Sequence, residues 1–280
     1  MRIGVFDSGL GGLLILRALV HAMPEHAYRY LGDTKRVPYG DRSPETIRTF
    51  THEGVAALVQ QGCSVILLAC NTASVHALAF LQARYADSHP HVRILGMIEP
   101  SLQAIPSFRQ TKIGILATQA TVDSGFFVEA LRHRGYTSIK QQAAPLLVPA
   151  IEQNMLRYSQ PILYHYLQPF AGKIDILLLA CTHYPRVKTR IRAHLGPKIR
   201  VLSQDEFIVP YLREQLRNFE TPTDSKQEPP VIQVTDITPL YRRLTKQWFG
   251  ATTVLEHVTL APVCTPLPQN PKSASTDSPA

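Results

Sequence analysis

Short apolar runs alternate with amphipathic stretches along most of the chain. Four runs stand out: residues 3–6 (IGVF), 65–69 (VILLA), 113–117 (IGILA) and 176–180 (ILLLA). Strands that read as unbroken apolar runs are typical of parallel sheets, because helices cover both faces of such sheets. The pattern therefore predicts an α/β fold with mainly parallel sheets.

Two of the intervening helices have recognisable ends. Residues 43–45 (Ser-Pro-Glu) supply an N-cap, a first-turn proline and an acid that favours the helix dipole, and Gly62 is suited to end this helix. A second helix is expected to begin at Pro185 and end at Gly196, because apolar residues at 187, 191 and 195 recur at helical spacing.

The chain contains an internal repeat. IGVFDSG (3–9) resembles IGILATQ (113–119), and LLACNTAS (67–74) resembles LLACTHYP (178–185), in the same order and at nearly the same spacing. Two related halves would each place one cysteine, Cys70 or Cys181, at the carboxyl end of a strand, where open α/β sheets bind ligands. A pseudo-twofold arrangement of the halves would bring the two cysteines face to face.

The repeat suggests two pseudo-symmetric α/β domains with a cleft between them. We expect a first domain of residues 1–97 plus about 207–264, to which VIQVT and a helix around 240–248 return, and a second domain of residues 98–206. The polar, proline-containing stretch 221–230 is expected to be a loop. Residues 265–280 are rich in Pro, Ser and Thr and are expected to be a disordered tail.

Composition narrows the class of protein. The hydrophobic content of 45% is ordinary for a soluble globular chain. The first residues do not form a signal peptide, and no stretch approaches about 18 uninterrupted apolar residues, so we expect a cytoplasmic protein without a membrane span. The net charge of +8 would attract acidic partners, but the scattered Lys and Arg favour an ordinary solvated surface over a nucleic-acid site.

The four cysteines are candidates for chemistry. Cys63, Cys70, Cys181 and Cys264 form no C-x-x-C pair and no disulfide framework. Cys70 and Cys181 each precede polar residues that can start a helix, a position that can lower the pKa of a thiol. Either one alone could equally be a small buried hydrophobe, but their equivalent places in the repeat favour function. Cys63 and Cys264 are expected to be structural.

Three rival chemistries use the same residue types. A zinc site made by Cys70, Cys181 and His183 lacks a fourth ligand and an H-x-x-x-H pair. A nucleophilic cysteine hydrolase leaves the second cysteine without a role. A pyridoxal phosphate enzyme needs a Schiff-base lysine, and only Lys35, in a loop that reads as surface, lies near the motifs. We therefore expect no metal and no cofactor.

The loop after the first apolar run is rich in glycine. Residues 7–12 (DSGLGG) lead into a helix, so their backbone N–H groups could hold an anion such as a substrate carboxylate. The loop matches neither G-x-G-x-x-G nor a P-loop. The alternative, that the glycines serve only a tight turn, stays open, and Asp7 at the strand end is the stronger indication of a site.

At these residues the sequence resembles the glutamate racemases of the aspartate/glutamate racemase superfamily. The resemblance runs in the family's order from the N-terminus to about residue 187 and is loose beyond Ser203. The matching stretches are VFDSGLGGL (5–13), GDTKRVPYGDRS (32–43), ACNTAS (69–74), GMIEPS (96–101), ATQATVDSG (117–125), LLVPAIE (146–152) and ACTHYP (180–185).

The resemblance implies a cofactor-independent racemisation of glutamate by two bases, with the active site between two α/β domains. Cys70 and Cys181 then correspond to the proton donor and acceptor. The residues that correspond to substrate-binding pairs are Asp7-Ser8, Tyr39-Gly40, Asn71-Thr72 and Thr182-His183, and those that correspond to assisting polar residues are Asp33, Glu152 and His183.

The sequence departs from the family pattern in places. The family's usual D-S-G near the end of the second half is here Ser203-Gln204-Asp205, and the cysteine often found before P-L-L-V-P is Ala144. The ATxxT stretch carries Gln119 and Ala120 at its variable positions. None of these departures touches the two bases.

Racemisation requires an ionised base and a protonated acid on opposite faces of one carbon, and two thiols meet that requirement symmetrically. We hypothesise that Asp7 assists proton handling at Cys70 and that His183 does so at Cys181. Fixed hydrogen-bond donors must stabilise the carbanion-like state. The available donors are Ser8, Asn71, Thr72, Thr182 and the N–H groups of the glycine loop. A separate pocket would bind the side-chain carboxylate of the substrate, with Tyr39-Gly40 on its wall.

Other functions stay open. A racemase of the same superfamily could act on aspartate or another amino acid and keep both cysteines. Some glutamate racemases are reported to inhibit DNA gyrase, so an interaction with gyrase is the alternative of a different class. If glutamate is the substrate, the resemblance implies that D-glutamate feeds peptidoglycan synthesis. The oligomeric state is undetermined, with a homodimer as one alternative.

Overall fold

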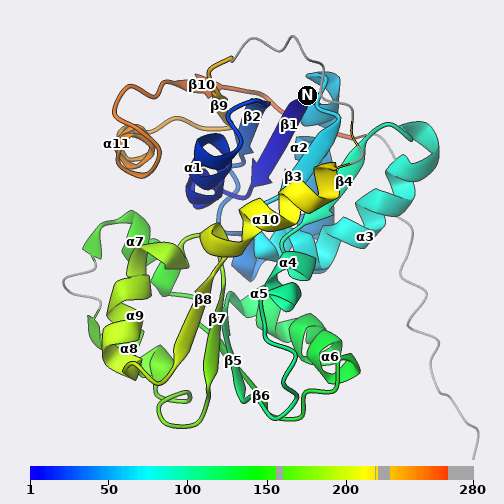
Figure 1. Cartoon of the computed structure of the whole chain (residues 1–280). Coiled ribbons are helices and arrows are strands. Elements are labelled where there is room, and N and C mark those ends of the chain that lie inside the picture. The colour runs from blue at the N-terminus through cyan, green and yellow to red at the C-terminus, as the bar shows by residue number, and fades with distance from the viewer. Residues whose placement is uncertain (156–159, 218, 220–227, 264–280) are drawn as a thin grey trace, which may run out of the picture.

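Two parallel β-sheets form the framework of the computed structural model, which describes residues 1–155, 160–217, 219 and 228–263 (Figure 1). Every strand pair in the two sheets is parallel. The predicted α/β fold with two sets of mainly parallel strands is therefore confirmed. The predicted tail 265–280, Cys264 and most of the predicted loop 221–230 lie outside the described residues.

The larger sheet has the strand order β10-β9-β2-β1-β3-β4. Its central strands are buried along nearly their whole length, as the unbroken apolar runs predicted. The strands are β1 (Arg2–Asp7), β2 (Ala27–Gly32), β3 (Val65–Leu68), β4 (Arg93–Gly96), β9 (Val231–Val234) and β10 (Leu255–His257).

The smaller sheet has the order β6-β5-β7-β8. Its two inner strands are completely buried, which again follows from their apolar sequences. The strands are β5 (Ile113–Ala117), β6 (Ile139–Ala143), β7 (Ile176–Ala180) and β8 (Arg200–Ser203).

Helices connect the strands. Those of the larger sheet are α1 (Gly12–Ala22), α2 (Pro44–Gln60), α3 (Asn71–Ser88) and α11 (Pro239–Trp248), with a 3₁₀ turn η1 (Tyr39–Asp41). Those of the smaller sheet are α5 (Gln119–Asp123), α6 (Phe126–His133), α7 (Leu147–Glu152), α8 (Gln160–Leu167) and α9 (Lys188–Leu195), with a 3₁₀ turn η3 (Tyr184–Val187). No described helix is long and apolar enough to cross a membrane.

The ends of two helices were predicted from the sequence, and one of the two predictions is confirmed at its start. The N-cap of α2 is confirmed, because the Ser43 hydroxyl accepts the N–H of Thr46, and the chain turns away at Gly62 with φ of 77°. The helix predicted to begin at Pro185 begins later, at Lys188. Residues 184–187 form a tighter 3₁₀ turn instead, in which Arg186 N–H donates to the carbonyl of His183.

Two short crossings join the sheets. Helix α4 (Ile98–Gln103) follows β4 and leads to β5, and α10 (Gln204–Leu216) follows β8 and leads back toward β9. Figure 1 shows α10 lying across the junction, where it packs against α1 and α4. A single apolar cluster includes Leu13 of α1, Leu177 of β7 and Leu212 of α10, so the core is continuous between the two sheets.

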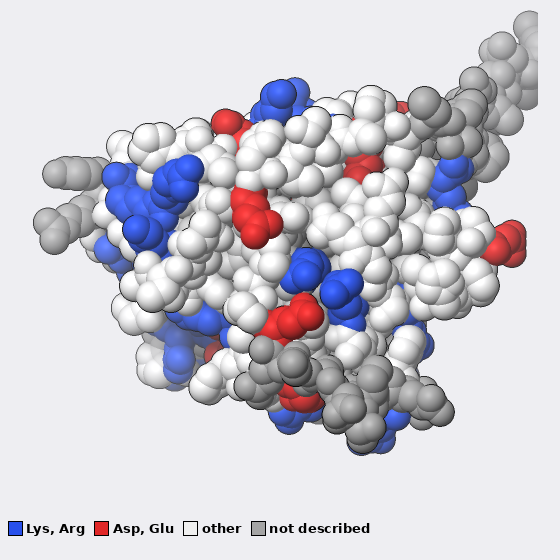
Figure 2. All heavy atoms as spheres, turned by 90° about the horizontal axis from the view of Figure 1, so that it is seen from above, with Lys and Arg blue, Asp and Glu red and all other residues white. Residues whose placement is uncertain are grey.

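Surface charge is distributed in separate groups. On the face seen in Figure 2, Lys and Arg side chains form several clusters with Asp and Glu between them. Several cations are paired, including Arg36 with Asp33 and Glu53, and Lys188 with Glu206.

Candidate active site

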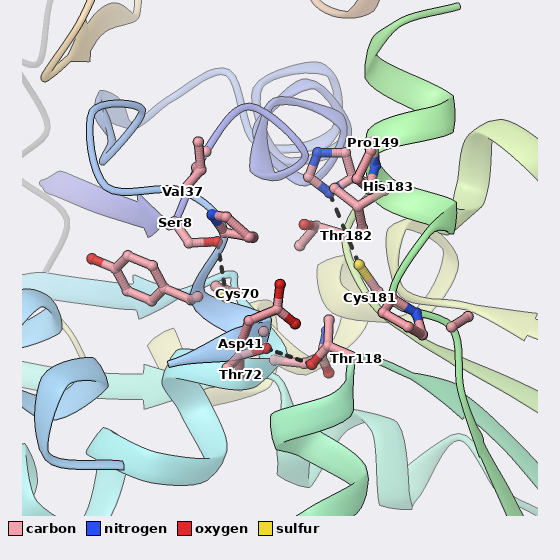
Figure 3. Close-up of a pocket in the computed structure, with 18 of the residues that line it drawn as sticks. Ser8, Val37, Asp41, Cys70, Thr72, Thr118, Pro149, Cys181, Thr182 and His183 are labelled. Atoms are coloured by element: carbon pink, nitrogen blue, oxygen red, sulfur yellow. Dashed lines mark hydrogen bonds between the residues drawn. The ribbon is translucent and has the colours of Figure 1, made fainter. Parts of the chain in front are cut away.

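A cavity of about 180 Å³ lies where the carboxyl ends of strands from both sheets meet (Figure 3). Three of its residues follow directly after a strand, Ser8 after β1, Thr118 after β5 and Cys181 after β7, and Cys70 comes two residues after the end of β3. The volume is below the roughly 300 Å³ at which pockets for drug-sized ligands begin, so the cavity suits a small molecule.

Ten of the twelve predicted site residues line this cavity. They are Ser8, Tyr39, Gly40, Cys70, Asn71, Thr72, Glu152, Cys181, Thr182 and His183. The two sulfur-bearing residues enter from opposite sides in Figure 3, one from each sheet. The predicted Asp7 and Asp33 do not line the cavity, and both are completely buried behind it.

Cys70 begins α3. Its sulfur accepts the N–H of Ala73 at 3.5 Å, and its thiol donates to the Ser8 hydroxyl at 3.3 Å. Burial and then the charge of Asp7 raise the pKa of Cys70 to about 12, outweighing these hydrogen bonds. The amide at the helix terminus does lower this pKa, as expected, but burial outweighs it, so the net shift is upward. Cys70 is a protonated thiol at neutral pH.

Cys181 lies beside a histidine. Nδ1 of His183 is 3.9 Å from the Cys181 sulfur, and Nε2 of the same ring is 2.8 Å from Oε1 of Glu152. Burial alone would lower the pKa of His183, but the hydrogen bonds and charges of Cys181 and Glu152 hold it well above its usual value. The two sulfurs therefore have different surroundings, a hydroxyl at Cys70 and a buried imidazole at Cys181.

Asp7 holds the glycine loop in place. Its Oδ2 accepts the N–H groups of Gly9 at 3.2 Å and Gly12 at 3.1 Å, and its Oδ1 accepts the hydroxyl of Thr182 at 3.4 Å. Two amides that were expected to be available for an anion thus donate to Asp7 instead. Burial raises the pKa of Asp7, against the lowering effect of His183 and these amides. Asp7 shapes the loop that presents Ser8 and Gly9 to the cavity.

Asp33 has a similar supporting place. It accepts hydrogen bonds from the Tyr39 hydroxyl at 2.6 Å, from Nε of Arg36 at 2.6 Å and from the Thr235 hydroxyl at 2.8 Å. The Tyr39 hydroxyl therefore points at Asp33 while other atoms of Tyr39 line the cavity. Asp33 therefore holds the loop that carries Tyr39.

Two important residues were not among the predicted site residues. Thr118 lines the cavity, and its hydroxyl lies 2.8 Å from that of Thr72. It occupies the same place in the repeat as Ser8, so the repeat contained the signal. Gln204 pairs with the side chain of Asn71 across 133 residues of sequence, and no local pattern indicated that contact.

Metal ligands and a cavity lysine would be needed for two of the rival chemistries. In residues 1–155, 160–217, 219 and 228–263, no three His, Cys, Asp or Glu side chains gather as metal ligands. No lysine is among the described residues that line the cavity, and Lys35 is exposed.

Comparisons with known proteins identify racemases as relatives of this chain. The Asp/Glu/Hydantoin racemase family matches residues 13–206. A glutamate racemase of Aquifex aeolicus (strain VF5) is 38% identical over 221 residues, which cover 78% of this chain and 84% of the relative.

Solved structures share the fold. A glutamate racemase isoform from Bacillus anthracis has a TM-score of 0.85 at 29% identity, and the match covers 92% of this chain and 97% of that chain. Glutamate racemase from Francisella tularensis subsp. tularensis SCHU S4, in complex with D-glutamate, has a TM-score of 0.84 at 28% identity with the same coverage of the two chains.

Proposed function

This chain belongs to the Asp/Glu/Hydantoin racemase family, among its glutamate racemases, and we propose that it interconverts L- and D-glutamate with Cys70 and Cys181 as the two bases. The observation that carries the proposal is that both thiols line one small cavity from equivalent strand ends of the two sheets. That placement provides a proton-transfer group on each side of a bound amino acid.

The reaction needs one sulfur ionised and the other protonated. The thiolate removes the Cα proton from one face of glutamate, and the opposite thiol returns a proton to the other face. Because its pKa is raised, Cys70 begins as the protonated partner in the free enzyme. In the reverse direction the two sulfurs exchange roles.

The surrounding polar groups have distinct roles in this scheme. His183, held by Glu152, handles the proton at Cys181, and Ser8 does so at Cys70. Thr72 and Thr182, with Asn71, contribute fixed donors for the carbanion-like state, and the Tyr39-Gly40 turn forms part of the wall. Asp7 and Asp33 act indirectly, through the glycine loop and Tyr39.

Glutamate is favoured over aspartate as the substrate. The glutamate racemase from Francisella tularensis, whose structure has the same fold as this chain, was solved in complex with D-glutamate. D-glutamate made here would enter peptidoglycan synthesis in the cytoplasm. A homodimer and an association with gyrase stay predictions, which sedimentation of the purified chain alone and mixed with gyrase would test.

The two sheets also suggest the domain division. We propose a first domain of residues 1–97 plus about 207–264 and a second of residues 98–206. The strands β9 and β10 support this division because they join the sheet of β1 to β4. Limited proteolysis followed by mass mapping would test it, and cuts concentrated within either sheet would contradict it.

The catalytic proposal is tested by Cys70→Ala and Cys181→Ala, with Cys63→Ala as the control. Cys63 is also buried, but it is not among the residues that line the cavity. Circular dichroism of L- and D-glutamate, without added cofactor, should show each active-site variant slowed by about a thousandfold or more, while the control keeps its rate. Deuterium exchange at Cα in D₂O reports the surviving base. Full racemisation by either active-site variant would refute the scheme.

A further inference from the structure

A buried pair of amide side chains lies beside the cavity. Nδ2 of Asn71 donates to Oε1 of Gln204 at 3.0 Å, and Nε2 of Gln204 donates back to Oδ1 of Asn71 at 2.6 Å. The two residues are 2% and 0% exposed. Two reciprocal hydrogen bonds without competition from water fix both carboxamide planes.

The pair joins two separate parts of the fold. Asn71 is the first residue of α3 and directly follows Cys70, whereas Gln204 is the first residue of α10 and directly follows β8. Helix α10 is the crossing that returns the chain from the smaller sheet to the larger one (Figure 1). The contact therefore ties the start of that crossing to the neighbour of a proposed base.

The pairing also sets which atoms of Asn71 face the cavity. A carboxamide oxygen accepts two hydrogen bonds and its nitrogen donates two. Gln204 uses one donor and one acceptor position of the Asn71 carboxamide. One donor and one acceptor position of Asn71 therefore remain, and the pairing fixes their directions. Asn71 lines the cavity and Gln204 does not, so Gln204 reaches the site only through its partner.

We propose that Gln204 is a positioning residue for racemisation, which orients the Asn71 amide toward the substrate and holds the first turn of α3 next to Cys70. This inference rests on the proposed glutamate racemisation. It also gives a role to the Ser203-Gln204-Asp205 stretch that departs from the family pattern. The neighbouring Ser203 hydroxyl donates to Asp205, so within this stretch it is Gln204 that reaches α3.

The test is a double-mutant cycle in kcat/KM. Gln204→Met keeps a side chain of similar length and removes both hydrogen bonds. We expect kcat/KM to fall by roughly ten- to hundredfold, mostly through kcat, as for other displacements of reacting groups. In the Asn71→Ala background the same change should cost less than about twofold, because the partner is already missing.

Controls separate positioning from general stability. Glu206→Gln, in the same turn of α10, removes an ion pair with Lys188 and should leave kcat/KM unchanged. Gln204→Glu keeps the acceptor for Asn71 but sets an oxygen against Oδ1 of Asn71 in place of the donor, so its kcat/KM should also fall by about tenfold or more. If Gln204→Met does not fold, the cycle is run with Gln204→Glu.

Each outcome decides the point. The positioning role would be overturned if a folded Gln204→Met or Gln204→Glu variant kept the wild-type kcat/KM. It would also be overturned if the change at position 204 reduced kcat/KM equally in the wild-type and Asn71→Ala backgrounds. Loss of folding by both variants at position 204 would also overturn it, because the residue would then be required for the fold itself. A wild-type protein that does not racemise glutamate would instead refute the proposed function.

Discussion

Nε2 of His183 lies 2.8 Å from Oε1 of Glu152, on the edge of the ring away from the Cys181 sulfur. One buried imidazole thus connects a carboxylate to a thiol. The ring also meets Trp248 of α11 edge-on, with centroids 5.6 Å apart, so its orientation is restricted by packing as well as by hydrogen bonds. The protonation of His183 therefore depends on Glu152, and in the proposed scheme proton handling at Cys181 depends on both.

Glu152→Gln should lower the pKa of His183, because it removes the negative charge that helps to hold this pKa above its usual value. A histidine with a raised pKa in the folded state stabilises the protein fully below its unfolded pKa of about 6.5, and this stabilisation is lost as pH rises through the folded pKa. The free energy of unfolding should therefore differ most between wild type and variant below about pH 6.5 and converge at high pH.

Urea unfolding at several pH values, with an NMR titration of His183, provides the measurement. Glu206→Gln serves as the control, because Glu206 pairs with Lys188 and not with a histidine. Parallel stability curves for Glu152→Gln and the wild type at all pH values would show that Glu152 does not set the protonation of His183.

Asp7→Asn should make Cys70 more reactive toward iodoacetamide. Burial and the Asp7 charge together raise the pKa of Cys70 to about 12, and the thiolate is the reactive form. Removing the charge lowers the pKa, so alkylation at a fixed pH of about 8 should become faster by several-fold. Mass mapping separates Cys70 from Cys63, whose pKa of about 11 is raised by burial and should not respond to Asp7→Asn. A slower reaction at Cys70 in the variant would contradict this account.

Much of the fold follows from the apolar runs. The four runs identified in the sequence became β1, β3, β5 and β7, because a strand covered on both faces must be apolar throughout. The edge strand β6 has the sequence IKQQA and is only partly buried. Because it is not an apolar run, the sequence pattern did not predict it as a strand. Fold class and the principal strands are thus readable from local pattern, whereas polar edge strands depend on pairing that the local sequence does not show.

The site was predictable where residues recur in the repeat. Cys70 and Cys181 stand at equivalent strand ends, and the cavity brings them together. The net direction of the Cys70 pKa shift was not predictable from the helix terminus alone, because burial outweighs the hydrogen bond from Ala73. The partnership of Asn71 with Gln204 was not predictable, since it depends on how α10 crosses between the sheets.

Tyr39→Phe should cost stability more than activity. The hydroxyl donates to Asp33 at 2.6 Å, away from the cavity, and Asp33 keeps its hydrogen bonds from Arg36 and Thr235. Losing a buried hydrogen bond to a charged acceptor should reduce the free energy of unfolding by about 1.5–3 kcal/mol. We expect kcat to change by less than about threefold, because the Tyr39 backbone and ring remain in place.

Chemical denaturation and steady-state kinetics check this expectation. Tyr241→Phe is the matched comparison, because its hydroxyl donates to the Thr34 carbonyl at the longer distance of 3.4 Å and should contribute less. A large loss of kcat in Tyr39→Phe at unchanged stability would mean that the hydroxyl turns to the substrate.

Gly11→Ala should reduce catalysis strongly, because Gly11 lies where the glycine loop meets the smaller sheet. A Cβ atom there would stand 2.3 Å from Oγ1 of Thr182 and 2.5 Å from Nδ1 of His183. The backbone of Gly11 is in the ordinary right-handed region, with φ of −58°, so space rather than conformation excludes a side chain. The methyl group must displace either residue, and His183 is held by Glu152. We expect kcat to fall by about a hundredfold and the free energy of unfolding by about 1–3 kcal/mol.

Gly250→Ala is the control, since its Cβ would meet Thr253 at an ordinary 3.4 Å. Steady-state kinetics and thermal unfolding of both variants provide the measurement. A Gly11→Ala enzyme with wild-type kcat would show that turnover does not require His183 and Thr182 to stay beside Gly11.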